Sequence, residues 1–194
     1  MKDMEEDFVA SLGYISLAVR LKRISDTMVH AGRQMYKRLG VDIEPNWFLV
    51  LILLEKKLSL SITEIADEVH FSHPSIITMV NKMKKAGYVQ SHVDPGDSRR
   101  QLVQLTQKAH DKLPAYRQIW EAGITGIEKM LLDHPQFLQA LDALESQYRE
   151  ADFMERTLNE YTHVEPKSWR FNRWFSPTSS KMQIKRVLWS HQDS

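Results

Sequence analysis

The sequence predicts a mainly α-helical protein with a small β-hairpin, and two observations lead to this prediction. Between Ile62 and Lys85, two apolar patterns with helical spacing follow each other closely, with a break at residues 70–72. Further along, the β-rich runs 89–93 and 102–105 flank a polar Pro-Gly segment, as in a hairpin. Together they predict a winged helix-turn-helix, in which the second helix can enter a DNA major groove and the hairpin, or wing, lies beside it.

The first helix of this unit is expected to run to about Val69. Thr63 can cap it, and Glu64 and Asp67 lie where the positive end of the helix dipole favours acidic groups. Ile65 and Val69 share one apolar face. The pattern therefore indicates a short amphipathic helix that packs on the core.

The second helix is expected to begin after Ser72, a suitable N-cap, with Pro74 in its first turn. Its apolar positions follow helical spacing and are Ile76, Met79, Val80 and Met83. The opposite face carries short polar groups followed by lysines, namely Ser75, Thr78, Asn81, Lys82 and Lys85. Such a face can approach base edges at its N-terminal end and phosphates at its C-terminal end. Gly87 is predicted to end the helix in a left-handed conformation.

The wing is expected at residues 89–105, with its turn at Asp94-Pro95-Gly96-Asp97. Arg99 and Arg100 come just after the tip. A guanidinium carried on a thin ribbon can reach into a minor groove, whose negative potential attracts it.

The segment 94–106 resembles the wing signature of the MarR family of bacterial transcriptional regulators, an Asp, one variable residue and an Arg, followed by an apolar strand that ends in Leu-Thr. The matching residues are Asp97, Arg99, Leu105 and Thr106, and the resemblance extends to residues 62–69 and 85–89. The three matching stretches lie between residues 62 and 106 with consistent spacing.

The resemblance implies roles for particular residues. It implies that Arg99 inserts into the minor groove and that Asp97 pairs with a wing arginine to hold the tip. It places major-groove contacts at His73, Pro74, Ser75, Ile77, Thr78, Asn81 and Lys82, and we expect Lys85 and Arg100 to bind phosphates. Many members carry basic residues where this chain has Thr78 and residues 90–92, so the grip on phosphates is expected to be weaker. Ile77 stands where polar residues are common, and it can meet a thymine methyl or be partly buried.

Composition supports a local binding surface and excludes several other sites. The 194 residues carry a net charge of only +1. The segment from Asn81 to Lys108, however, contains six basic and two acidic residues, which gives it a net charge of +4. The absence of cysteine excludes disulfides and thiolate metal sites and fits a cytoplasmic location. The acidic start does not resemble a signal peptide, and the apolar run 47–54 is too short to span a membrane.

The segments on both sides of the winged helix are predicted to be helical and to carry more apolar surface than one small domain can cover. In the MarR family such helices interleave between two chains, which implies a homodimer; the alternative is packing within one chain. We therefore divide the chain into an N-terminal dimerisation region (1–40), a winged helix-turn-helix (41–106), C-terminal dimerisation helices (107–161) and a C-terminal arm (162–194). After Thr106, a long helical region is expected to run to about Leu132, and Pro114 near its start is expected to bend this helix or to shift its start. A further single helix is expected from Phe137 to Leu158.

The C-terminal arm mixes aromatic and basic residues, which are Lys167, Trp169, Arg170, Phe171, Arg173, Trp174, Phe175, Lys181, Lys185, Arg186 and Trp189. Such a mixture can stack on bases, lie on a membrane surface or pack against the protein itself. We favour packing against its own or its partner's helices.

No sequence pattern supports catalysis or a cofactor. The eight histidines show no metal-binding spacing, and no glycine-rich phosphate loop or nucleophile with a nearby base is present. Members of the resembling family commonly bind a small effector between the DNA-binding lobe and the dimer helices. The places to look for it are Tyr14, Arg20, Trp47, Phe48 and Trp120, although such residues also build cores.

The leading hypothesis is a cytoplasmic, homodimeric, ligand-responsive repressor that binds a pseudo-palindromic site in double-stranded DNA without a cofactor, a metal or a membrane. An alternative is a winged-helix protein-interaction module that does not bind DNA specifically. A third is an enzyme whose site is assembled from scattered residues, which a deep pocket holding perturbed histidines or carboxylates would indicate.

Overall fold

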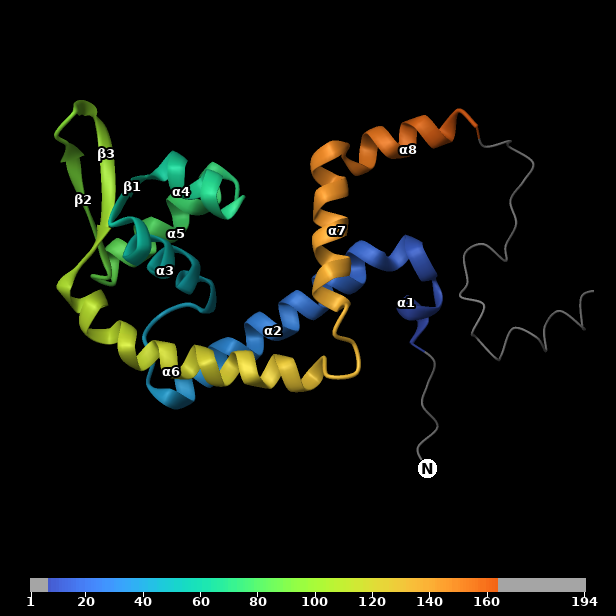
Figure 1. Cartoon of the computed structure of the whole chain (residues 1–194), viewed down its shortest axis with the longest axis horizontal. Coiled ribbons are helices and arrows are strands. Elements are labelled where there is room, and N and C mark those ends of the chain that lie inside the picture. The colour runs from blue at the N-terminus through green and yellow to red at the C-terminus, as the bar shows by residue number, and fades with distance from the viewer. Residues whose placement is uncertain (1–6, 164–194) are drawn as a thin grey trace, which may run out of the picture. The chain divides into compact units, whose positions relative to one another are not determined.

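A computed structural model of the chain describes residues 7–163. In chain order the elements are α1 (Phe8–Ser11), η1 (Gly13–Ser16), α2 (Leu17–Leu39), η2 (Pro45–Trp47), α3 (Phe48–Lys57), β1 (Ser59–Ser61), α4 (Ile62–Val69), α5 (His73–Lys85), β2 (Val89–Asp94), β3 (Asp97–Leu105), α6 (Gln107–Met130), α7 (Phe137–Glu150) and α8 (Phe153–Tyr161) (Figure 1). The chain forms two compact units, which we treat separately. Of the described residues, 7–31 and 144–163 belong to one unit, and 32–143 belong to the other.

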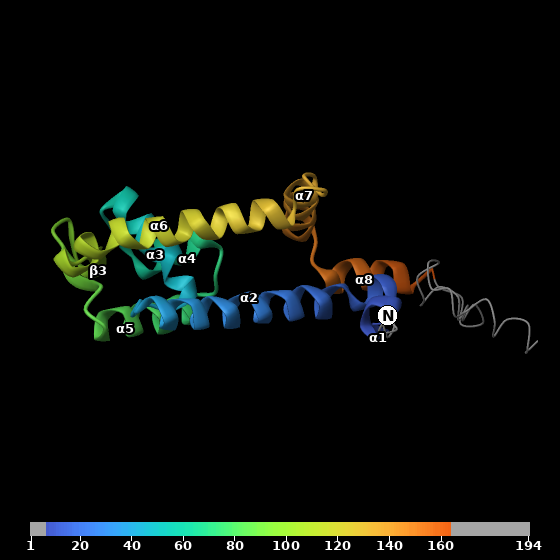
Figure 2. The same ribbon diagram turned by 90° about the horizontal axis from the view of Figure 1, so that it is seen from below.

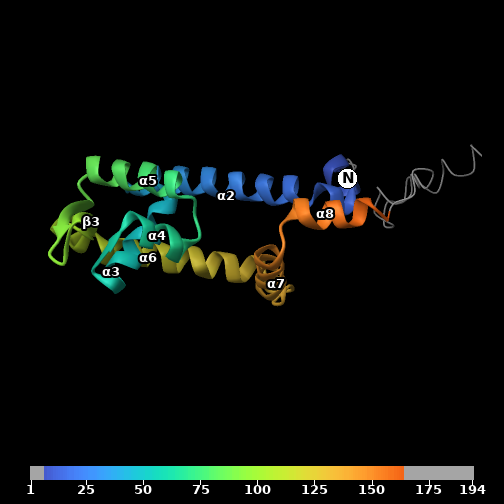
Figure 3. The ribbon, with the colours of Figure 1, turned by 90° about the horizontal axis from the view of Figure 1, so that it is seen from above.

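The unit of residues 32–143 contains a winged helix. Its three-stranded antiparallel sheet has the order β1-β3-β2. Leu102 of the central strand β3 is paired with Ser61 of β1 on one side and with His92 of β2 on the other. Helices α3, α4 and α5 gather beside this sheet in every view, and α6 follows directly from β3 (Figures 1, 2 and 3). The predicted fold class, a mainly helical protein with a small β-wing, is confirmed. The short strand β1 completes the sheet on the outer side of β3.

The start of α4 differs from the sequence prediction. Ser61, not Thr63, is the N-cap: its hydroxyl accepts a hydrogen bond from the Glu64 backbone N–H at 3.3 Å, and the Glu64 carboxylate accepts one from the Ser61 N–H at 2.8 Å. This reciprocal pair is a capping box, which satisfies two backbone donors at the helix end. The prediction of Thr63 as the cap was wrong. In a capping box the cap lies three residues before the glutamate, and Ser61, not Thr63, has this spacing from Glu64.

The turn between α4 and α5 and the exit from α5 use left-handed backbone. His70 ends α4 at φ 52°, and Gly87 follows α5 at φ 77°, as predicted for the end of that helix. Thr106, at the end of the wing, donates its hydroxyl hydrogen to the Gly87 carbonyl oxygen at 2.6 Å. The exit from α5 is therefore tied to the junction between the wing and α6.

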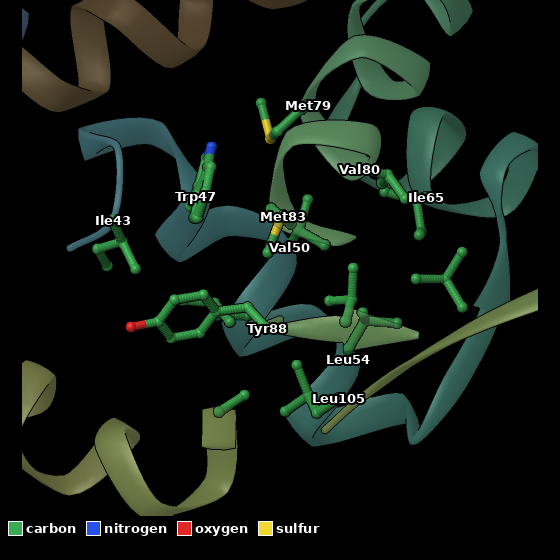
Figure 4. Close-up of a cluster of buried hydrophobic side chains, with 14 of the residues drawn as sticks. Ile43, Trp47, Val50, Leu54, Ile65, Met79, Val80, Met83, Tyr88 and Leu105 are labelled. Atoms are coloured by element: carbon green, nitrogen blue, oxygen red, sulfur yellow. The ribbon is translucent and has the colours of Figure 1, made fainter. Parts of the chain in front are cut away.

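The core of the winged helix brings α3, α5 and the strands together. Figure 4 shows side chains of η2 and α3, among them Trp47 and Val50, converging with Met79 and Met83 of α5. Tyr88 is fully buried, and the ring centroids of Trp47 and Tyr88 lie 5.9 Å apart in an edge-to-face arrangement. Burying the inner face of α5 in this way leaves its other face directed to solvent.

The unit of residues 7–31 and 144–163 has no comparable core. Among its described residues no hydrophobic side chain is buried, and Ser16 is the one residue that is. Many of its large apolar side chains are exposed, including Phe8, Ile24, Met28, Phe153 and Leu158. Exposed apolar surface of this extent is typical of a site that contacts another protein.

Two details of the C-terminal helices differ from the sequence prediction. The helix expected from Phe137 to Leu158 is two helices, because the chain breaks at residues 151–152 and Asp152 caps α8 by accepting a hydrogen bond from the Glu155 N–H at 2.8 Å. Pro114 lies inside α6 without moving its start, which Thr106 caps through the Ala109 N–H at 3.3 Å. Of the predicted C-terminal arm (162–194), residues 164–194 lie outside the described residues. Across residues 7–163, no helix combines the length and the apolarity that a membrane crossing would require.

The capping box makes a direct prediction about stability. Ser61→Ala should lower the free energy of unfolding by about 1 kcal/mol, because the backbone donor that the hydroxyl satisfies is then left without a partner. Thr63→Ala is the matched control and should change it by less than about 0.5 kcal/mol. Urea denaturation at one fixed protein concentration measures both values. Equal losses in the two variants would contradict the assignment of Ser61 as the cap.

Candidate nucleic-acid interface

Helix α5 presents one buried and one exposed face. The buried face consists of Ile76, Met79, Val80 and Met83, as predicted. The residues of this helix that are predicted to contact DNA are all exposed, and they are His73, Pro74, Ser75, Ile77, Thr78, Asn81, Lys82 and Lys85. Three lysines occupy the last turn, Lys82, Lys84 and Lys85. The helix therefore offers a polar surface that becomes basic toward its C-terminal end.

The wing holds its tip through backbone contacts. The Asp94 carboxylate accepts a hydrogen bond from the Gly96 N–H at 2.9 Å, and the Asp97 carboxylate accepts one from the Arg99 N–H at 3.0 Å. Asp97, expected to steady the wing by pairing with an arginine side chain, thus contacts the Arg99 backbone. Side-chain to backbone bonds of this kind stabilise tight turns.

The two wing arginines have different surroundings. The Arg99 side chain is exposed and makes no hydrogen bond or ion pair within residues 7–163. Arg100 instead forms an ion pair with Glu64 of the capping box and lies 3.4 Å from Asp94. Its guanidinium is therefore already neutralised by two carboxylates, whereas that of Arg99 is available to an external anion.

The bond to Arg100 lowers the pKa of the Glu64 carboxyl. Together with the bonds from Ser61, the Arg100 guanidinium brings this pKa to about 2, from an ordinary value of 4.5. The charged form of Glu64 therefore links the first turn of α4 to the wing at every pH above that range. Because 39% of the Arg100 side chain and 42% of the Glu64 side chain remain exposed, solvent screens the pair, and its effect on global stability is small.

A polar cluster around Asp42 holds the exit of α5 against α6. The Asp42 carboxylate accepts hydrogen bonds from the hydroxyls of Tyr88 and Tyr116, the latter at 2.9 Å, and lies 3.0 Å from the Lys108 ammonium. Lys108 also donates to the Ala86 carbonyl at 2.9 Å and lies 4.3 Å from the centroid of the Tyr88 ring. Sequence analysis missed this cluster, because its members are far apart in the chain.

The cluster changes the acidity of its members in opposite directions. Partial burial alone would raise the pKa of Asp42, but the hydrogen bonds from Tyr88, Lys108 and Tyr116 outweigh it and hold that pKa far below its ordinary value. Burial, together with the nearby carboxylate, raises the pKa of Tyr116 to about 12 and that of Tyr88 further. Both tyrosines are therefore neutral donors and Asp42 is a charged acceptor at any physiological pH.

The residues predicted to hold an effector are only partly brought together. Phe48 and Trp120 are in ring contact, with centroids 6.2 Å apart, and the Trp120 indole N–H donates to the Tyr36 hydroxyl at 2.9 Å. Trp47 is buried in the core, although it also lines an open hollow with Asp42, Lys82 and Lys85. Tyr14 is 97% exposed and belongs, like Arg20, to the other unit. Within residues 7–163, no group of three histidines or carboxylates is arranged to hold a metal ion.

Comparison with known proteins finds the same architecture. Residues 41–100 match the sequence profile of the MarR family. The DNA complex of Staphylococcus aureus MepR superposes with a TM-score of 0.60 at 18% identity and covers 68% of this chain and 97% of its own. A mutant MarR from E. coli complexed with operator DNA gives 0.56 at 17% identity, covering 69% and 93%. Reduced AbfR bound to DNA gives 0.55 at 18% identity, covering 69% and 91%. No curated protein sequence matches the chain.

The link between the wing and α4 can be tested by its pH dependence. The ion pair with Arg100 lowers the pKa of the Glu64 carboxyl. It therefore stabilises the folded state at pH values above 4.5, the ordinary pKa of this group, and the contribution is lost as the pH falls through about 2. The Glu64 carboxyl carbon should therefore show no NMR titration between pH 6 and pH 3.5. In Arg100→Ala the same carbon should begin to titrate in this interval, because the main cause of the low pKa is removed. Unchanged titration in that variant would refute the ion pair.

Proposed function

We propose that the protein is a MarR-type transcriptional regulator that binds double-stranded DNA, because its winged helix, residues 41–100, matches the sequence profile of the MarR family. The observation that carries the proposal is the pairing of an exposed, increasingly basic face on α5 with an unpaired arginine, Arg99, on the adjoining wing. The solved relatives MepR, MarR and AbfR, which share this fold, are complexes with DNA.

We assign a separate role to each part of the interface. Helix α5 lies in the major groove, with Lys82 and Lys85 on phosphates, and the wing places Arg99 in the flanking minor groove. His73, Pro74, Ser75 and Thr78 line the approach to the base edges. Arg100 contributes less than Arg99, because Glu64 and Asp94 already compensate its charge.

The proposed role of Arg99 gives the first binding prediction. Arg99→Ala should weaken operator binding by about 1 to 3 kcal/mol and make the dependence of log K on log salt less steep by about one, because one cation no longer contacts the DNA. Fluorescence anisotropy over a range of salt concentrations measures both quantities. Arg38→Ala, which removes an exposed arginine from α2, is the control and should leave both unchanged. A wild-type chain that binds all DNA at one nonspecific level would instead favour a protein-interaction module.

We also propose that the regulator acts as a homodimer. Helix α2 carries an exposed apolar row made by Leu17, Leu21, Ile24, Met28 and Met35, and its successive spacings of four, three, four and seven residues fit a helix-pairing seam. The unit of residues 7–31 and 144–163, which lacks buried hydrophobic side chains, would gain a core from the second chain. We therefore assign residues 1–40 and 107–161 to dimerisation and residues 41–106 to DNA binding, on half-sites about one helical turn apart.

A charge placed in the seam tests the dimer. Ile24→Glu should convert the dimer to a monomer in size-exclusion chromatography with light scattering, because two carboxylates would have to be buried together. Ile24 is 54% exposed in the single chain, and Ile52 of α3, which is 46% exposed, is the matched control. Ile52→Glu should leave the dimer intact. A monomeric wild-type protein, or an Ile24→Glu variant that stays dimeric, would contradict the proposed seam.

The regulatory consequence follows from the dimer. In the cytoplasm, a dimer bound across a promoter blocks polymerase, and an effector that changes the separation of the two α5 helices releases it. The neighbouring rings of Phe48 and Trp120 are the first place to look for effector contacts, since 38% of Phe48 is exposed.

A further inference from the structure

Several polar groups in the first turns of α5 already have partners within the chain. The hydroxyls of Ser72 and Ser75 share a hydrogen bond of 2.7 Å, and the Thr78 hydroxyl donates to the Pro74 carbonyl at 2.9 Å. The His73 ring nitrogen Nε2 lies 3.3 Å from the Thr63 hydroxyl. A donor that is bonded within the helix is less available to a base edge, so reading by these residues would require exchange of existing bonds.

On the central turns of α5, the exposed side chains of Ile77 and Asn81 are not engaged in hydrogen bonds with other described residues. Ile77 is 40% exposed, while its neighbour Ile76 is completely buried, so the Ile77 side chain lies on the outer face of α5. The Asn81 side chain is exposed and makes no hydrogen bond within residues 7–163. The two positions are four residues apart, which places them next to each other on one helix face, about 6 Å apart.

The chemistry of these two side chains selects one kind of base pair. In the major groove, the 5-methyl group of thymine is the apolar feature that an aliphatic side chain can contact. The adenine edge offers an N7 acceptor and an N6 donor, which match the donor and acceptor of an asparagine amide. An isoleucine against guanine or cytosine would instead desolvate polar base atoms without replacing their hydrogen bonds.

We propose that Ile77 and Asn81 determine the operator sequence by reading A·T pairs, with Ile77 against a thymine 5-methyl group and Asn81 bonded to N6 and N7 of an adenine. The inference rests on the proposed DNA-binding function and deepens it. Because the two side chains are about 6 Å apart and successive base pairs rise by about 3.4 Å, the thymine and the adenine lie within about two base-pair steps.

The first stage of the test is selection of bound sequences from a random DNA pool by the full-length protein. Enrichment of one pseudo-palindromic sequence with a thymine and an adenine within two steps in each half-site is expected. If no sequence is enriched, the proposed function fails and this inference with it. If a sequence is enriched whose half-sites contain only G·C pairs under α5, the proposed function stands and this inference is overturned.

The second stage removes a single methyl group. Each thymine of the selected half-site is replaced by deoxyuridine, which lacks only the 5-methyl. When the thymine that Ile77 contacts is replaced in one half-site only, the affinity should fall about fourfold, the value of one buried methyl group. Ile77→Ala should bind the thymine and uracil operators equally, whereas the control Ile52→Ala should keep the preference. The proposed contact would be overturned if Ile77→Ala still bound the thymine operator more tightly than the uracil operator, or if the wild-type protein bound both equally.

The third stage removes one acceptor. Replacement of the half-site adenine by 7-deazaadenine, which has carbon in place of N7, should weaken wild-type binding about tenfold, the effect of losing part of a two-bond contact. Asn81→Ala should bind both operators alike. A tenfold loss that persists in Asn81→Ala would assign the adenine contact to another residue and overturn this part of the proposal.

Discussion

The position of α5 depends on the hydrogen bonds and the ion pair that the Asp42 carboxylate forms. Tyr88 follows the Gly87 turn at the end of α5, and Lys108 and Tyr116 lie on α6, so one carboxylate receives donors from both sides of the wing. Because Tyr88 and Tyr116 are buried, their hydroxyls need an acceptor, and loss of Asp42 would leave them only each other. The exit of α5 is therefore fixed relative to α6 by polar bonds as well as by packing.

The wing uses adjacent arginines for opposite purposes. Successive residues of a strand point to opposite faces, so Arg100 turns toward α4, where Glu64 binds it, while Arg99 points away. Glu64 in turn caps α4 through Ser61, which connects the tip of the wing to the start of the helix-turn-helix. An arm held in this way can present a free guanidinium at a defined place, which is what recognition of a groove requires.

The two units differ in how they satisfy their apolar side chains. Residues 32–143 enclose a core around Leu51, Leu54 and Tyr88, whereas the described residues of the other unit leave Phe8, Ile24 and Leu158 exposed. In our proposal the second unit finds its core in a second chain. Dimerisation would then fix the distance between two copies of α5, and specificity would combine this spacing with the reading of A·T pairs by Ile77 and Asn81.

The sequence by itself determined the winged helix and its exposed face, because these follow from local periodicity, a turn glycine and a Pro-Gly hairpin. It also contained the Ser61 to Glu64 capping box, which the spacing could have revealed. Only the tertiary structure decided which wing arginine is free, since that depends on Glu64, 36 residues before Arg100 in the sequence. The Asp42 cluster was equally beyond prediction: its partners lie 46, 66 and 74 residues away, and no local pattern records which distant side chains folding brings together.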